Sequence, residues 1–313
     1  MHLRSLVLAL AIAAAGCSQP GATPQQAPRK EAAMPKLLTW PDLLKRSRPH
    51  PTHTIQYGPA KTDVGDLWIP SGPGPHKTVV MIHGGCWQKS VADRTLMDWS
   101  AEALMKAGFA VWNIEYRGVD EEGGGYPGTF HDVARAADQL RELRVQYSLD
   151  LDHVAAFGHS AGGHLAMWLA ARPKLPASSG VYTDNPLPIE AVLNSGGLAD
   201  LKASAPVTQA DCLADIMDKL TGPPSAQRPD VLSDTSPARL LPLGVKMISV
   251  NGANDTIAPA KLGEGWTALA TRAGDRAETI VMPETGHVEL VAPGSKAFDA
   301  EIAALKRLLM VAG

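Results

Sequence analysis

A short run at residues 158–162 constrains the fold of this chain more than any other feature. It reads Gly-His-Ser-Ala-Gly, follows an apolar stretch at 153–157 and opens a second apolar stretch at 163–171 that is long enough for a helix. A strand, a tight turn with a central serine and then a helix are the context that holds a serine as a nucleophile. Flanking glycines suit such a turn because a Cβ there would collide with neighbouring backbone. Ser160 is therefore the candidate nucleophile.

Two later loops supply the partners that such a serine needs, in the order acid and then histidine. An apolar run at 245–250 predicts a strand, and Asp255 lies in the loop that follows it. The next strand-like run, at 278–282, is followed by a loop that carries His287. Serine is a weak nucleophile unless an adjacent base takes its proton, and a carboxylate orients that base. We therefore predict a catalytic triad of Ser160, Asp255 and His287.

A glycine-rich loop upstream can stabilise the negative charge that forms on a carbonyl oxygen under attack. The apolar run at 78–82 leads into His-Gly-Gly-Cys-Trp at 83–87. Glycines let the backbone turn inward, so that main-chain N–H groups can face the oxyanion. The N–H of Ala161, directly after the candidate nucleophile, is a further donor in this arrangement.

Together these motifs resemble those of the α/β-hydrolase superfamily, in its esterase and lipase branch, over residues 55–312. The run at 83–87 is similar to the H-G-G-x-W motif of the kynurenine formamidases, which implies an oxyanion hole at Gly85 and Cys86. The run at 158–165 also resembles bacterial feruloyl-esterase-like and prolyl-oligopeptidase-like hydrolases. The resemblance implies the α/β-hydrolase fold and a serine hydrolase, and it leaves the substrate open.

The apolar pattern predicts alternating strands and helices, as in a mainly parallel sheet flanked by helices. Strand-like runs lie at 64–69, 78–82, 109–114, 153–157, 190–194, 245–250 and 278–282. Helical stretches lie at 91–107, 129–147, 160–171, 259–273 and 295–311. Residues 197–241 form a small insertion, which we expect to be either a lid that lines the pocket or plain scaffold.

The beginning of the chain differs in composition from the rest. A basic start, an apolar run of ten residues and a small-residue end are typical of a signal peptide, here residues 1–16. Cys17 then resembles the lipidated first residue of a bacterial lipoprotein, and ordinary secretion with a chance cysteine is the alternative. Residues 17–36, rich in Pro, Gln and Ala, predict a tether. Residues 37–313 are left as the hydrolase domain.

The lipoprotein signal implies a bacterial cell-envelope protein that a lipid anchors to the membrane. Ser18, which follows the cysteine, points to the outer membrane by analogy with Gram-negative sorting. That compartment permits disulfides. Cys86 and Cys212 either form a bridge that pins the insertion over the active site or remain two separate buried thiols.

We expect the chain to hydrolyse carboxylic esters of small or medium acyl groups through an acyl-enzyme, with a small-molecule ester as its partner. Trp87, beside the oxyanion loop, and Tyr126, in a glycine-rich loop, are the candidate substrate-binding side chains. The alternatives are an arylformamidase, a prolyl-oligopeptidase-like peptidase and a catalytically dead binding module. A net charge of −3 argues against a nucleic-acid partner. No typical metal-ligand spacing or phosphate loop occurs, so we expect neither a metal nor a cofactor.

Overall fold

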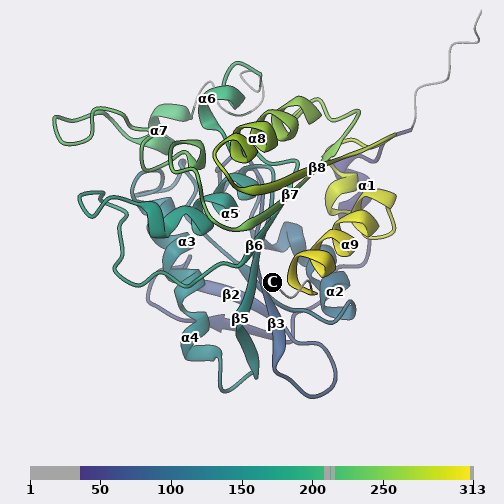
Figure 1. Cartoon of the computed structure of the whole chain (residues 1–313). Helices are drawn as coiled ribbons and strands as arrows, with labels where there is room; N and C mark the ends of the chain where they lie inside the picture. Colours follow the sequence, from purple (N-terminus) through teal and green to yellow (C-terminus); the bar gives the residue numbers. More distant parts are fainter. Residues whose placement is uncertain (1–35, 208–211, 213–215, 311–313) are drawn as a thin grey trace, which may run out of the picture. The chain divides into compact units, whose positions relative to one another are not determined.

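An eight-stranded sheet forms the centre of the part of the chain that the structure describes, residues 36–207, 212 and 216–310 of a computed structural model (Figure 1). The strand order across the sheet is β1-β2-β4-β3-β5-β6-β7-β8. The bounds are β1 (His53–Gln56), β2 (Val64–Trp68), β3 (His76–Ile82), β4 (Ala110–Ile114), β5 (Leu149–His159), β6 (Ala191–Ser195), β7 (Lys246–Gly252) and β8 (Arg276–Met282).

The direction of the strands decides where a site can form. Strands β4, β3, β5, β6, β7 and β8 are parallel, and β1 and β2 join them as an antiparallel edge. Every residue of β4 and of β6 is buried, because helices cover both faces of the sheet. Parallel pairing brings the carboxyl ends of the strands to one edge, where the loops carry the candidate catalytic residues.

Helices pack on both faces of the sheet and form two hydrophobic cores. The larger core lies under α3, α4, α5 and α8, and the smaller one joins α1, α2 and α9 to the other face. All eleven residues of α5 are buried, because a helix that is apolar on most sides is stable only inside the core. The helices are α1 (Trp40–Leu44), α2 (Asp98–Lys106), α3 (Gly128–Asp138), α4 (Leu140–Leu143), α5 (Ala161–Ala171), α6 (Leu201–Ser204), α7 (Met217–Thr221), α8 (Ala260–Arg272) and α9 (Lys296–Met310).

The predicted sheet with flanking helices is confirmed, and each of the seven strand-like runs forms a strand. The expected helix at 91–107 begins as a 3₁₀ turn, η1 (Arg94–Met97), and the one at 129–147 is divided between α3 and α4. The sequence analysis missed β1 and α1. Strand β1 is a mostly exposed edge of four residues, and α1 has only five, so neither leaves a clear periodic signal.

The predicted insertion at 197–241 contains α6, α7 and a 3₁₀ turn, η4 (Pro237–Arg239). Its residues 208–211 and 213–215 lie outside the described residues. Residues Lys36–Gly313 form one compact unit, and among its described residues no helix combines the length and the apolar character that a membrane span requires. The predicted signal peptide and nearly all of the predicted tether precede the described part of the chain.

Candidate active site

The turn between β5 and α5 holds Ser160 in an unusual backbone conformation, with φ 56° and ψ −120°. Residues with a side chain rarely adopt this conformation, and it persists only where the surroundings enforce it. A Cβ at Gly158 would lie 2.0 Å from the carbonyl oxygen of Gly162, so the turn has no room for a side chain there. The Ser160 N–H donates to the carbonyl oxygen of Ser195, 2.9 Å away, which ties the turn to β6.

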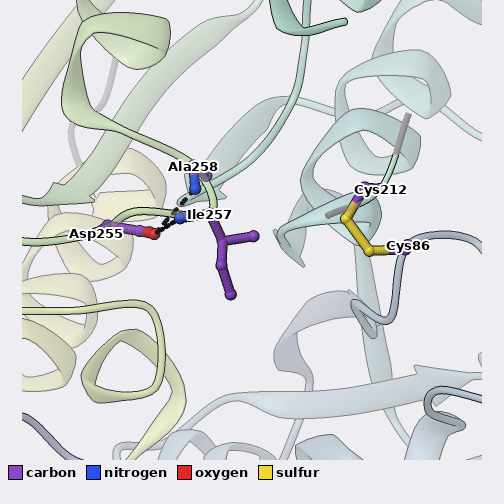
Figure 2. The surroundings of a disulfide bond; sticks show 5 residues. All are labelled: Cys86, Cys212, Asp255, Ile257 and Ala258. Atoms are coloured by element: carbon purple, nitrogen blue, oxygen red, sulfur yellow. Dashed lines mark hydrogen bonds between the residues drawn. A yellow bond between two sulfur atoms is a disulfide. The ribbon is translucent and has the colours of Figure 1, made fainter. Parts of the chain in front are cut away.

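The two later loops bring Asp255 and His287 together. His287 Nδ1 lies 2.7 Å from Asp255 Oδ2, and both residues are buried. The other carboxylate oxygen accepts from the N–H groups of Ile257 and Ala258, each at 2.9 Å (Figure 2). Burial raises the pKa of Asp255, but the hydrogen bond and charge interaction with His287, helped by the N–H groups of Ala258 and Ile257, hold the pKa below its usual value. An ionised Asp255 keeps a proton on His287 Nδ1, which leaves Nε2 able to accept a proton.

Ser160 and His287 share the wall of one cavity of about 290 Å³. This volume lies at the lower end of the range for small-molecule sites, about 300–1,000 Å³. Apart from the serine hydroxyl, two imidazoles and the indole N–H of Trp40, the lining carries no polar side-chain group. The lining residues are Trp40, Leu44, Gly85, Cys86, Val91, Ala92, Leu96, His159, Ser160, Ile257 and His287.

The loop after β3 passes directly over the candidate nucleophile. A Cβ at Gly84 would lie 3.0 Å from the Cβ of Ser160. Gly85 and Cys86, with φ of 105° and 54°, line the cavity beside Ser160. Ala161 is the first residue of α5, directly after the serine. The structure thus brings the three residues predicted to donate to an oxyanion around Ser160.

A buried carboxylate supports this loop from behind. His83 Nε2 donates to Glu115 at 2.9 Å, and Lys89 Nζ donates to the other oxygen at 2.6 Å. Burial alone would raise the pKa of Glu115, but the hydrogen bonds from His83 and Lys89 lower it to about 2. The His83 ring also stacks on Tyr116, with ring centroids 4.3 Å apart. Charge and packing together fix the start of the loop.

A disulfide between Cys86 and Cys212 settles the choice that the sequence left open (Figure 2). The two cysteines are 126 positions apart in the chain, and their Cα atoms are 5.1 Å apart. The bridge ties the loop over Ser160 to the insertion at 197–241. No described residue of the insertion lines the cavity, so the bridge holds the loop without placing a described lid over it.

Trp87, which we expected to contact substrate, is fully buried and does not line the cavity. Its Nε1 donates to His164 Nδ1 at 3.2 Å, and His164 Nε2 donates to the carbonyl oxygen of Thr235 at 2.7 Å. Burial lowers the pKa of His164 to about 4, which keeps this ring neutral and able to accept. A buried indole needs a partner for its N–H, and this one finds it in the core. Contact of Trp87 with substrate stays a prediction.

Tyr126, the other candidate substrate-binding residue, does not line this cavity either, and its contact with substrate stays a prediction. Its hydroxyl donates to Asp234 Oδ2 at 3.0 Å, and the guanidinium of Arg228 lies 3.7 Å from the ring centroid. Both partners belong to the insertion. Tyr126 thus fastens the insertion to the loop before α3. Its hydroxyl binds the carboxylate of Asp234, and its ring face binds the guanidinium of Arg228.

Several residues that shape the cavity, above all Trp40 and Leu44 of α1, were not predicted from the sequence. A signal for this helix exists, because Thr39, Pro41 and Asp42 form the pattern of a helix start. In the structure the N–H and the hydroxyl of Thr39 both donate to Asp42 Oδ2, at 3.1 and 2.7 Å.

Among the described residues no group of three or more potential ligands could hold a metal ion.

A family model described as BD-FAE matches residues 66–265. Esterase B from Lactobacillus rhamnosis, inhibited by a C6-C4 compound, has a similar structure, with a TM-score of 0.71 at 21% identity over 84% of this chain and 89% of that one. A truncated carbohydrate esterase from gut microbiota has a TM-score of 0.65 at 18% identity, over 82% of this chain and 94% of that one. The butyrate-bound Est2 esterase from the planctomycete Thermogutta terrifontis has a TM-score of 0.65 at 18% identity, over 82% of this chain and 93% of that one. No curated protein matches. These structures show that the fold is that of the α/β-hydrolases.

Proposed function

Since the chain belongs to the BD-FAE family, an esterase family of the α/β-hydrolase type, we propose that it hydrolyses carboxylic esters with Ser160, His287 and Asp255 as its catalytic triad. One observation carries the proposal. Ser160, held in a strained turn, shares a cavity with His287, whose Nδ1 lies 2.7 Å from Asp255. A nucleophile, a base and a residue that orients the base are the groups that acyl transfer needs.

The reaction begins when Ser160 Oγ attacks the ester carbonyl carbon and His287 Nε2 takes its proton. The carbonyl π electrons move onto the oxygen, where the N–H groups of Gly85, Cys86 and Ala161 stabilise the negative charge. Collapse of this intermediate breaks the bond to the alcohol, and His287 gives its proton to the leaving oxygen. Water then attacks the acyl-enzyme by the same route and releases the acid.

Small or medium acyl groups fit this site best. The cavity of about 290 Å³ is small, and its lining carries no Asp, Glu, Lys or Arg side chain. A charged substrate group would lose its hydration there without gaining a partner, which is costly. The substrate is therefore an ester with uncharged groups on both sides of the scissile bond.

The test is hydrolysis by the full chain, in mild detergent, of short and long p-nitrophenyl esters, a feruloyl ester and N-formylkynurenine. We expect turnover of the shorter esters, abolished in Ser160→Ala, and covalent labelling of Ser160 by a fluorophosphonate. Formamide turnover far above ester turnover would replace the proposal with an arylformamidase. A protein that neither labels nor turns over any ester would be a binding module.

We further propose that Cys17 carries lipid and anchors the enzyme to the bacterial envelope, because it directly follows a signal-like segment. Cells given a palmitate analogue should label the wild-type protein and not Cys17→Ser. An unlabelled wild type, or label that survives the substitution, contradicts the anchor and leaves ordinary secretion.

A further inference from the structure

One wall of the cavity comes from α1, which lies outside the residues that the family model matches. Trp40 and Leu44 are four positions apart on this helix, so their side chains lie on one face. The Trp40 ring stands edge-on to two imidazoles, with centroid distances of 6.3 Å to His287 and 6.1 Å to His159. Leu44 is 48% exposed and lies at the rim. These two residues form what we call the α1 wall.

The α1 wall is fixed to the loop that carries His287. Leu43 is fully buried in the core that also contains α2 and α9. One oxygen of the buried Glu289 accepts from the N–H of Leu38, and the other accepts from the N–H of Gly286 at 2.9 Å. A single carboxylate therefore joins the segment before α1 to the residue preceding His287.

A second part of the lining follows the oxyanion loop. Val91, Ala92 and Leu96 line the cavity together with Gly85 and Cys86, and we call these five residues the loop wall. The two walls face different parts of an ester for a chemical reason. His287 must give its proton to the alcohol oxygen as that oxygen leaves, so the alcohol group lies on the side of His287. That side is the α1 wall.

We propose, on the basis of the esterase function above, that Trp40 and Leu44 form the alcohol-binding wall and select esters of aromatic or aliphatic alcohols. An indole offers a large apolar surface to such a group. Ile257, on the turn that holds Asp255, adds an aliphatic side chain to the lining (Figure 2). A charged alcohol would meet no counter-charge among the residues that line the cavity.

The two-step reaction separates this role from a merely structural one. The alcohol leaves when the acyl-enzyme forms, so a residue that touches only the alcohol affects acylation and not deacylation. His287 acts in both steps, so a residue that only positions His287 affects both. Trp40→Ala should therefore lower kcat/KM for esters of apolar alcohols and leave the deacylation rate constant unchanged.

The experiment uses the full chain and butyrate esters of methyl, butyl and phenyl alcohols. For Trp40→Ala we expect kcat/KM to fall about 10- to 100-fold for the phenyl ester, less for butyl and little for methyl. Single-turnover loading with p-nitrophenyl butyrate gives the deacylation rate constant, which should stay within twofold of the wild type. Trp40→Phe keeps an aromatic ring and should retain most of the preference for the phenyl ester.

Leu96→Ala on the loop wall is the matched control. It should change kcat/KM by one common factor for all three alcohols. An equal loss for all alcohols in Trp40→Ala, or a slower deacylation, would overturn the alcohol-binding wall. If the wild type shows no ester turnover that Ser160→Ala abolishes, the esterase mechanism itself is overturned. The two failures are therefore distinguishable.

Discussion

The two walls of the cavity are built by different means. The loop wall begins at the oxyanion loop, which a disulfide from Cys86 and the buried carboxylate of Glu115 hold in place. The α1 wall rests on a short helix. The buried side chain of Leu43 and a hydrogen bond from the Leu38 N–H to Glu289 keep this helix in position. In the proposed mechanism the loop aims N–H groups at a charge that develops in both steps, whereas the only part of the substrate that α1 contacts is the departing alcohol. The more firmly held wall is therefore the one whose N–H groups must point at the reacting oxygen.

Loss of a triad side chain has the largest expected effect. Without the triad no ester is hydrolysed at a useful rate, whatever the two walls bind. Ser160→Ala and His287→Ala should each lower kcat by about 10⁴-fold and remain folded by circular dichroism. The reason is that no other hydroxyl side chain lines the cavity, and the second imidazole there, of His159, donates through Nε2 to the carbonyl oxygen of His287 at 3.1 Å. Turnover near the wild-type level in either variant contradicts the triad.

Opening the disulfide is the next largest change and acts on the loop wall. Cys86 and Trp87 both have positive φ, which is costly and persists only while the surroundings hold it. Cys212→Ser, or reduction of the wild type, should lower kcat about 10-fold or more, up to the ~10²- to 10³-fold cost of losing one oxyanion donor. It should also destabilise the protein by about 2–5 kcal/mol.

Steady-state kinetics with and without reductant test this prediction. Reductant should have no further effect on the Cys86→Ser/Cys212→Ser double variant, which controls for other actions of the reagent. An unchanged kcat after complete reduction would show that the loop keeps its shape without the bridge.

Removing the charge of Glu115 is expected to weaken the loop wall through stability rather than chemistry. Glu115→Gln removes the buried charge that faces Lys89 and Arg94, at a cost of about 3 kcal/mol, although Arg94 keeps its ion pair with Asp66. The pKa of Glu115 in the folded protein is about 2, below its ordinary value of 4.5. Its carboxylate therefore contributes stability that is fully present above pH 4.5 and is lost as the pH falls through 2.

Urea unfolding of wild type and Glu115→Gln at several pH values measures this effect. The difference in unfolding free energy should be largest at neutral pH and should shrink between pH 4.5 and pH 2. A difference that stays constant over this range would exclude the charge of Glu115 as its source.

The smallest expected effect lies on the α1 wall. Glu289→Gln retains one acceptor oxygen, so one of the two N–H groups, of Leu38 or of Gly286, loses its partner at a cost of about 1–3 kcal/mol. A looser α1 should reduce the ratio of kcat/KM for phenyl and methyl butyrate by a few-fold. Lys45→Ala, an exposed change at the end of the same helix, should leave the ratio unchanged. The same ratio in Glu289→Gln and wild type would mean that this carboxylate does not hold the wall.

The sequence by itself determined the order of the fold and the candidate chemistry. Each strand of the parallel sheet is a local apolar run, and each candidate catalytic residue follows one of these runs directly. Because parallel strands end at one edge, the positions of Ser160, Asp255 and His287 along the chain were enough to predict that they lie near one another. Local patterns of this kind survive in any single sequence.

Only the tertiary structure decided what surrounds those residues. The cavity joins Trp40, Val91 and Ile257 from three distant segments, and packing between segments leaves no periodic trace in the chain. The pairing of Cys86 with Cys212 also required the distance between their Cα atoms. Likewise, only the structure shows that the polar tip of Trp87 has a partner in the core and that of Tyr126 a partner in the insertion. The identity of a side chain sets what it can bind, and its neighbours in space set what it does bind.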